Sequence, residues 1–257
     1  MVQTGDALPM SNRVALYVTC LVDQVWPAVG EAAVTLLRRL GQDVVFDPRA
    51  VCCGQPAYNT GYRQEAAAQA KQWIASFERT RATHAVLPSG SCAAMVHHFP
   101  RLFEAGDPWH DRAAAMAHAS HELCAFVTDV LGLDDVGARF PATATWHDAC
   151  HGLRELGLKE QPRRLLRGVR ELQLVEMADA DACCGFGGTF SVKYPEISTA
   201  IVDRKCENIA RAAETGGVDC VVSGDVSCLM QIEGRLRRQG SAVRAVHVAE
   251  VLAGVDR

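Results

Sequence analysis

The sequence predicts an α/β protein: two pseudo-symmetric Rossmann-like halves with mainly parallel sheets, related by a pseudo-twofold axis. Two observations predict it. A set of cysteines occurs twice at nearly constant spacing, and an alternation of strand and helix patterns repeats with it. The chain has 257 residues, of which 49% are hydrophobic, and this is enough to fill the cores of one large or two small domains.

Each half is expected to contain three strands and two helices. In the first half we expect a strand at 13–20, a helix at 30–41 ended by Gly41, a strand at 43–47, a helix at 62–80 and a strand at 83–90. The second half repeats this order with a strand at 142–150, a helix at 159–169, a strand at 171–177, a helix at 196–215 and a strand at 218–224. Strands alternating with such helices imply parallel sheets joined by right-handed crossovers. We expect a first domain over residues 1–135 and a second over residues 136–257.

The duplicated cysteines form two sets of four. The N-terminal cysteine set is Cys20, Cys52, Cys53 and Cys92, and the C-terminal cysteine set is Cys150, Cys183, Cys184 and Cys228. The first three members are displaced by 130 or 131 positions and the last by 136, so one small insertion relates the sets. Each cysteine falls at or just beyond the carboxyl end of an expected strand, where open α/β sheets place their ligands. The four thiols of each half are therefore expected to converge.

Convergent thiolates are soft ligands that suit iron–sulfur clusters or tetrahedral zinc. Adjacent cysteines in an extended strand point to opposite sides, so both reach one centre only if the backbone turns sharply or the centre is large. Gly54 and Gly185, which follow the two cysteine pairs, allow such a turn at low cost. A multi-iron cluster is larger than a zinc ion, which favours iron–sulfur. Structural zinc and a thiol–disulfide enzyme that uses the vicinal pairs stay open as alternatives.

Several neighbouring residues have two interpretations. The backbone amides of Gly187 and Gly188 are expected to approach cluster sulfurs. His147 and His151 flank Cys150, and each is a metal ligand, a donor to a cluster sulfide, or a satisfied or surface histidine. The remaining residues of these types are expected to serve packing or the surface: Cys124, Cys206, Cys220, His97 and His98.

Charge and hydropathy exclude several classes of partner. The net charge is −4 and the charged residues are scattered, which argues against nucleic acid or an anionic membrane surface. The amino terminus lacks the apolar run of a signal peptide, and no segment approaches the roughly 18 consecutive apolar residues of a spanning helix. We expect a cytoplasmic protein, in which an odd count of 11 cysteines favours metal ligation or redox chemistry over disulfides.

The words around the cysteines resemble those of the CCG-domain, or cysteine-rich-domain, iron–sulfur proteins. That group includes the cysteine-rich subunit of heterodisulfide reductase and the iron–sulfur subunit of glycolate oxidase. The closer similarity, over residues 13–254, is to the lactate utilisation protein A family. It is carried by LYVTCLVDQVWPAVGEAAVTLLRRLG, CCGQPAYNTGY, PSGSCAAM, CCGFGGTFSVKYPEIS, SCLMQIEGRL and VHVAEVLAG.

The resemblance implies an iron–sulfur electron-transfer component that acts with lactate utilisation proteins B and C in oxidising L-lactate to pyruvate. The chain would be an oxidoreductase subunit without activity alone, and the site for the 2-hydroxy acid would lie on it or on a partner. It has no flavin or nicotinamide fingerprint.

One departure from the family pattern bears on the cofactor. The full CCG motif ends in C-x-x-C, whereas here Ser89 and Asp225 stand three residues before the last cysteine of each set. Four cysteines per set suit one ordinary [4Fe–4S] cluster per repeat and put a non-cubane cluster in doubt. The oxygens of Ser89 and Asp225 are candidate replacement ligands.

Overall fold

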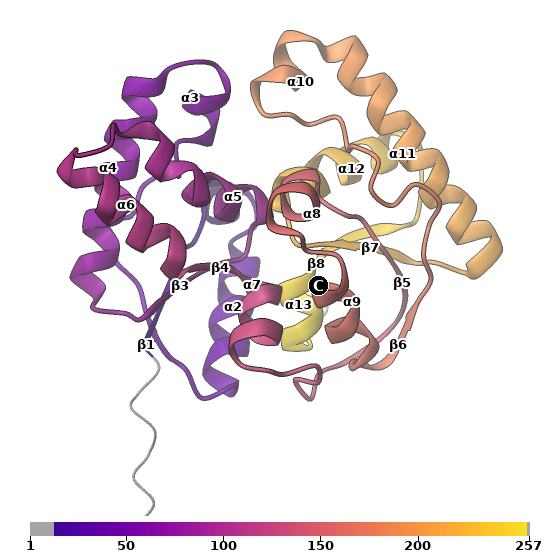
Figure 1. Ribbon diagram of the computed structural model, residues 1–257. Coiled ribbons are helices and arrows are strands. Elements are labelled where there is room, and N and C mark those ends of the chain that lie inside the picture. Colours follow the sequence, from indigo (N-terminus) through magenta and orange to yellow (C-terminus); the bar gives the residue numbers. More distant parts are fainter. Residues whose placement is uncertain (1–12, 256–257) are drawn as a thin grey trace, which may run out of the picture.

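Two four-stranded parallel sheets form the centre of the molecule, one in each half. The computed structural model describes residues 13–255, so the amino-terminal stretch searched for a signal peptide lies outside the described residues. The strand orders are β2-β1-β3-β4 and β6-β5-β7-β8, and every strand pair in them is parallel. The second sheet therefore repeats the topology of the first, and the expected α/β class with two similar halves is confirmed (Figure 1).

The first half contains four strands and the helices between them. The strands are β1 (Arg13–Leu16), β2 (Asp43–Val45), β3 (His84–Leu87) and β4 (Ser120–Glu122). The helices are α1 (Cys20–Val25), α2 (Pro27–Arg39), α3 (Gln55–Asn59), α4 (Arg63–Thr80), α5 (Gly90–His98), η1 (Phe99–Leu102), α6 (Pro108–Ala119), α7 (Leu123–Ala125) and the π-helical η2 (Phe126–Val130).

The second half follows the same plan. Its strands are β5 (Arg139–Trp146), β6 (Arg170–Leu174), β7 (Cys220–Ser223) and β8 (Arg244–His247). Its helices are α8 (Cys150–Leu156), α9 (Glu160–Arg167), α10 (Thr189–Lys193), α11 (Pro195–Gly216), α12 (Val226–Arg238) and α13 (Val248–Ala253). Helix α11 has 22 residues, yet within residues 13–255 no helix combines the length and the apolar character that a membrane crossing requires.

All the expected strands and helices are present, but each half contains more. A fourth strand, β4 or β8, extends each sheet, and the helices α5 and α12 follow the third strand directly. The helix expected at 30–41 begins earlier, at Pro27, because proline suits the first turn of a helix. These additions matter for the site, since α5 and α12 carry the last cysteine of each set.

The two halves share one hydrophobic core. Helix α13 at the end of the second half packs against α2 of the first, and α7 and η2 pack against α9 of the second (Figure 1). The Arg39 guanidinium donates to the carbonyl oxygens of Leu252 and Ala253. Buried residues of both halves, such as Leu16 and Phe140, belong to a single cluster, while two further clusters fill the outer part of each half. The shared core fixes the orientation of one half relative to the other.

Candidate metal centre

All eight duplicated cysteines line one cavity between the two halves. The cavity has a volume of about 420 Å³. Residues of α3 and α10 line it on the outer sides, and the amino-terminal ends of α1, α5, α8 and α12 line it from within (Figure 1). The structure thus brings together the four thiols of each set, and it also brings the two sets to the same cavity.

The N-terminal cysteine set is a continuous group of thiols. The sulfur atoms of Cys20 and Cys52 are 3.8 Å apart, and those of Cys53 and Cys92 are 3.5 Å apart. The hydrogen bond between Cys20 and Cys52 lowers the pKa of Cys52 and raises that of Cys20. Hydrogen bonds to Cys52 and Cys92 raise the pKa of Cys53 well above its usual value. Cys53 and Cys92 are buried, whereas Cys20 is exposed, so the group runs from the interior to the surface.

The C-terminal cysteine set has the same gradient of burial and gains a histidine. Cys184 and Cys228 are buried, and their sulfur atoms and one ring nitrogen of His147 lie within 4.8 Å of one another. Cys183 is exposed, and its sulfur accepts a hydrogen bond from the amide of Gly185 at 3.3 Å.

A sharp turn follows each pair of adjacent cysteines, as expected. Gly54 and Gly185 both have a φ of 84°, in the left-handed region that favours glycine. A Cβ atom on Gly185 would lie 2.5 Å from the carbonyl oxygen of Ser198, and one on Gly54 would lie 2.8 Å from Oε1 of Gln69. Only glycine therefore fits without displacing the neighbouring helix, and the turn lets both adjacent thiols line the cavity.

Helix starts supply a favourable field for the thiolates. Cys20 and Cys150 are the first residues of α1 and α8, and Cys92 and Cys228 lie in the first turns of α5 and α12. Free backbone N–H groups and the positive end of the helix dipole lie at such positions, so they stabilise negative charge on sulfur.

Ser89 and Asp225 meet each other between the two sets. The Ser89 hydroxyl donates to Oδ2 of Asp225 at 3.3 Å, and the same oxygen accepts from the amide of Ser91 at 2.8 Å. Oδ1 of Asp225 accepts from the amide of Ser227 at 3.1 Å. Asp225 thus caps α12 and also contacts the first turn of α5 in the other half. The oxygens that were candidate replacement ligands are engaged in these hydrogen bonds.

His147 is the polar side chain of this site whose role sequence reasoning left most open. It is 1% exposed, and neither Nδ1 nor Nε2 has a hydrogen-bond partner. Burial and the nearby Lys205 lower the pKa of His147 to about 3, so the imidazole is neutral. A neutral imidazole with a free lone pair beside two buried thiols is able to bind a metal.

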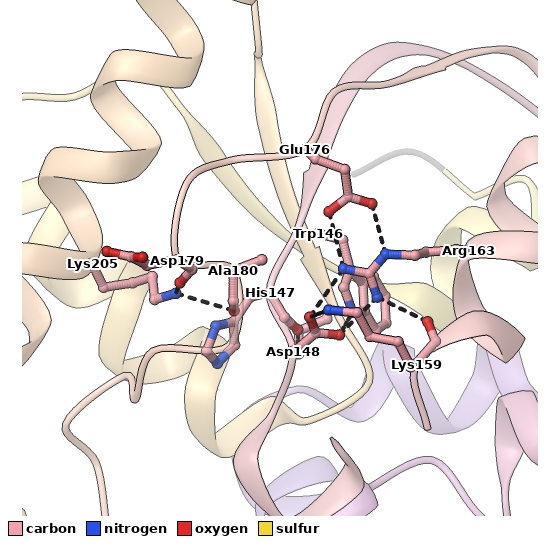
Figure 2. Close-up of polar contacts among 10 residues, drawn as sticks. Trp146, His147, Asp148, Lys159, Arg163, Glu176, Asp179, Ala180 and Lys205 are labelled. Atoms are coloured by element: carbon pink, nitrogen blue, oxygen red, sulfur yellow. Dashed lines mark hydrogen bonds and ion pairs between the residues drawn. The ribbon is translucent and has the colours of Figure 1, made fainter. Parts of the chain in front are cut away.

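An ion-pair network fixes the segment that leads to Cys150 (Figure 2). The buried carboxylate of Asp148 accepts from Arg163 Nη1 at 2.8 Å and Nη2 at 3.0 Å, from Trp146 Nε1 at 2.8 Å and from Lys159 Nζ at 3.0 Å. Arg163 also forms a paired contact with Glu176. Burial opposes ionisation of Asp148, but these donors outweigh it and lower the pKa of Asp148.

The other candidate residues have ordinary structural environments. The three cysteines without a repeat partner are buried, as expected: Cys124, Cys206 and Cys220. His97 contacts the carbonyl oxygen of Ser120, and His98 contacts Glu155 across the two halves. His151 lines the cavity, and its Nδ1 contacts the same Glu155. Gly187 and Gly188 also line the cavity, but the amide-to-sulfur bond described above comes from Gly185.

The donor set fits a sulfur-binding metal or cluster. All 11 cysteines of the chain lie in the described range and are free thiols. Separations of 3.5 and 3.8 Å between sulfurs match two thiolates on one tetrahedral metal atom, for which metal–sulfur bonds of about 2.3 Å give a separation of about 3.8 Å. The unpaired nitrogens of His147 also lack a partner that a metal would supply.

Comparison with known proteins agrees with the duplicated architecture. The profile of the Cysteine-rich domain (CCG) family matches residues 14–97 and again residues 144–233. Lactate utilization protein A of Exiguobacterium sp. is 47% identical over 240 residues, which cover 93% of this chain and 96% of that protein. Lactate utilization protein A of Geobacillus sp. is 46% identical, with coverage of 93% and 98%.

A solved structure shows a similar fold. A hypothetical protein from Helicobacter pylori superposes with a TM-score of 0.62 at 10% identity, over 97% of this chain and 50% of that one. This chain therefore spans half the length of that protein, and the likeness concerns the fold alone. With two matches to one domain profile and full-length relatives at 46–47% identity, the chain belongs to the lactate utilization protein A family of cysteine-rich (CCG) domain proteins.

Proposed function

We propose that this chain is an iron–sulfur electron-transfer component of a multi-protein system that oxidises L-lactate to pyruvate. The observation that carries the proposal is the single cavity lined by two complete sets of four cysteines. The names of the relatives support the link to lactate, since they are called Lactate utilization protein A. Lactate utilisation proteins B and C are the proposed partners.

Each cysteine set would hold one cluster, and the chain's residues are suited to that task. Clusters bound there would supply reversible one-electron transfer. The buried thiols Cys53 and Cys184 keep part of each site away from water, while Cys20 and Cys183 reach the surface where a partner protein can approach. The helix starts and the amide of Gly185 stabilise negative charge on the sulfurs.

A zinc-stabilised scaffold is a second candidate function. The sulfur separations of 3.5 and 3.8 Å favour it, because they equal the spacing of two thiolates on one tetrahedral ion. Zinc carries no redox chemistry, so in that case the chain would organise its partners without passing electrons. A zinc protein is colourless and gives no cluster signal in electron paramagnetic resonance.

Substitution of one buried thiol tests the proposal. We expect Cys184→Ser to lose about half of the bound iron and sulfide while the protein stays folded, because one of two clusters loses a ligand. Cys206→Ser is the matched control, since Cys206 is equally buried in α11 but does not line the cavity. Iron analysis, with far-ultraviolet circular dichroism as the folding check, reads out both variants. Unchanged iron in Cys184→Ser would overturn the assignment.

The link to lactate has its own readout. Purified protein is mixed without oxygen with the two partner proteins, and the visible absorption of its clusters is followed after L-lactate is added. Bleaching that requires both the partners and L-lactate supports the proposal. Persistence of the oxidised spectrum with active partners would contradict the proposed place in lactate oxidation.

A further inference from the structure

His147 is a buried polar side chain that lacks the partners its chemistry requires. Both ring nitrogens are unpaired, although the residue is only 1% exposed. One ring nitrogen lies within 4.8 Å of the sulfurs of both Cys184 and Cys228. We propose that His147 supplies a nitrogen ligand to the metal centre of the C-terminal cysteine set, which makes the two centres of the chain chemically different. This inference rests on the proposed metal-binding role of the cysteine sets.

The first half shows that the fold does not itself require an imidazole here. Tyr17 occupies the corresponding position, three residues before the first cysteine of its set. Its hydroxyl donates to the carbonyl oxygen of Trp73 at 3.2 Å, and its ring stacks on the Trp73 ring with centroids 3.9 Å apart. Tyr17 is thus satisfied by protein contacts alone, whereas His147 is not. A buried imidazole left unpaired costs free energy, and a metal bond would remove that cost.

The backbone of His147 is held firmly in place. Its amide donates to the carbonyl oxygen of Val222 at 2.9 Å, and its carbonyl oxygen accepts from the Ser223 hydroxyl at 3.0 Å. The next residue, Asp148, is fixed by Arg163, as described above. Such fixed geometry is what a metal ligand requires, because donor positions must be set before the metal binds.

Lys205 supports the imidazole from behind. Its buried ammonium donates to the carbonyl oxygens of Asp179 at 2.6 Å and Ala180 at 3.2 Å. Figure 2 shows the His147 ring on the side of Ala180 and Lys205, and the Asp148 carboxylate on the other side of the strand. The positive charge of Lys205 disfavours a protonated ring, and only a neutral imidazole binds a metal. Lys205 corresponds by position to Trp73, so both members of the buried pair differ between the halves.

Nitrogen hyperfine coupling tests this ligand directly. The sample is the full chain carrying Cys53→Ser, so that the paramagnetic signal comes from the C-terminal centre. Pulsed electron paramagnetic resonance is expected to show strong coupling to one nitrogen, and protein grown with 15N-labelled histidine is expected to show the matching isotope change. This comparison requires no substitution of His147. Coupling no stronger than that of a backbone amide, or no isotope change, would overturn the inference.

Two variants complete the test. His147→Gln is expected to lose the strong coupling, and His151→Gln, a second histidine beside Cys150 that also lines the cavity, is expected to keep it. The same strong coupling in His147→Gln would contradict the assignment.

A second probe separates failure of this inference from failure of the proposed function. If the purified protein holds zinc and gives no cluster signal, the iron–sulfur proposal fails, and Co²⁺ replaces zinc as the probe for His147. Loss of His147 is then expected to change the visible spectrum of the bound Co²⁺ and to weaken its binding by on the order of tenfold or more. An unchanged Co²⁺ spectrum and affinity would overturn the ligand assignment.

Discussion

Glu122 illustrates how burial changes the chemistry of a single residue in this fold. Its carboxylate caps α7, accepting from the amides of Cys124 at 2.7 Å and Ala125 at 3.2 Å, while Oε1 has no partner. Burial is the main cause that raises the pKa of Glu122 from 4.5 to about 7. Between these two pH values the unfolded chain is ionised but the folded chain holds its proton. Stability should therefore fall as the pH rises from 4.5 to about 7 and should not fall further above that range.

Glu122→Gln should remove this loss, because glutamine keeps an oxygen for the cap but does not ionise. We expect the free energy of unfolding of the variant, relative to the wild type, to increase by on the order of 3 kcal/mol between pH 4.5 and pH 7. Urea unfolding of both proteins at several pH values measures the difference. Parallel stability curves for the two proteins would show that Glu122 is ionised at all these pH values.

Single residues also show what a sequence does and does not predict about the site. The two cysteine sets were predictable because their spacing repeats, and the glycine turns were predictable because adjacent thiols need them. The contact between Ser89 and Asp225 was not predictable in this way. It forms because repeat-related residues 136 positions apart meet where the halves join, and no local pattern indicates that meeting. The isolation of His147 likewise depends on partners from distant strands and helices.

The crossing of α5 and α8 is the tightest contact between helices of different halves. A Cβ atom on Gly90 would lie 3.2 Å from the Cα atom of Gly152 and 3.3 Å from its amide nitrogen. The Gly90 amide also donates to the carbonyl oxygen of Gly224 across the halves at 3.3 Å. We predict that Gly90→Ala lowers the free energy of unfolding by about 1–3 kcal/mol, because the backbone of α8 must move to admit the methyl group.

Gly234→Ala in α12 is the matched control for this substitution. A Cβ atom there meets nothing within 4 Å, so the change should raise the free energy of unfolding by up to about 1 kcal/mol through helix propensity. Urea unfolding measures both variants. Equal effects of the two substitutions would contradict close packing between α5 and α8.

At the level of elements, the long patterned segments were predictable and the short ones were not. The helices α4 and α11 and the strands β1 and β7 carry clear periodic patterns. Strand β4 has only three residues, Ser120–Glu122, and their polar side chains indicate a strand only once β3 is beside them. Helices α5 and α12 begin so soon after a strand that the change of period is hard to see in the sequence.

At the level of the whole molecule, the halves are less independent than a simple duplication suggests. The repeat predicts two similar units, but it does not predict that α13 packs on α2 or that α7 packs on α9. These exchanges join the halves through a shared core, so the orientation of the two cysteine sets is fixed by packing. The single cavity is a consequence of this exchange, and spacing within one repeat contains no information about it.

The measurement that tests the central claim most directly is the content of iron, zinc and acid-labile sulfide per chain in protein purified without oxygen. Two complete cysteine sets on one cavity predict about eight iron atoms and about eight sulfides per chain, as two [4Fe–4S] clusters require. Zinc without sulfide would contradict the electron-transfer function and leave the chain as a structural partner of another enzyme.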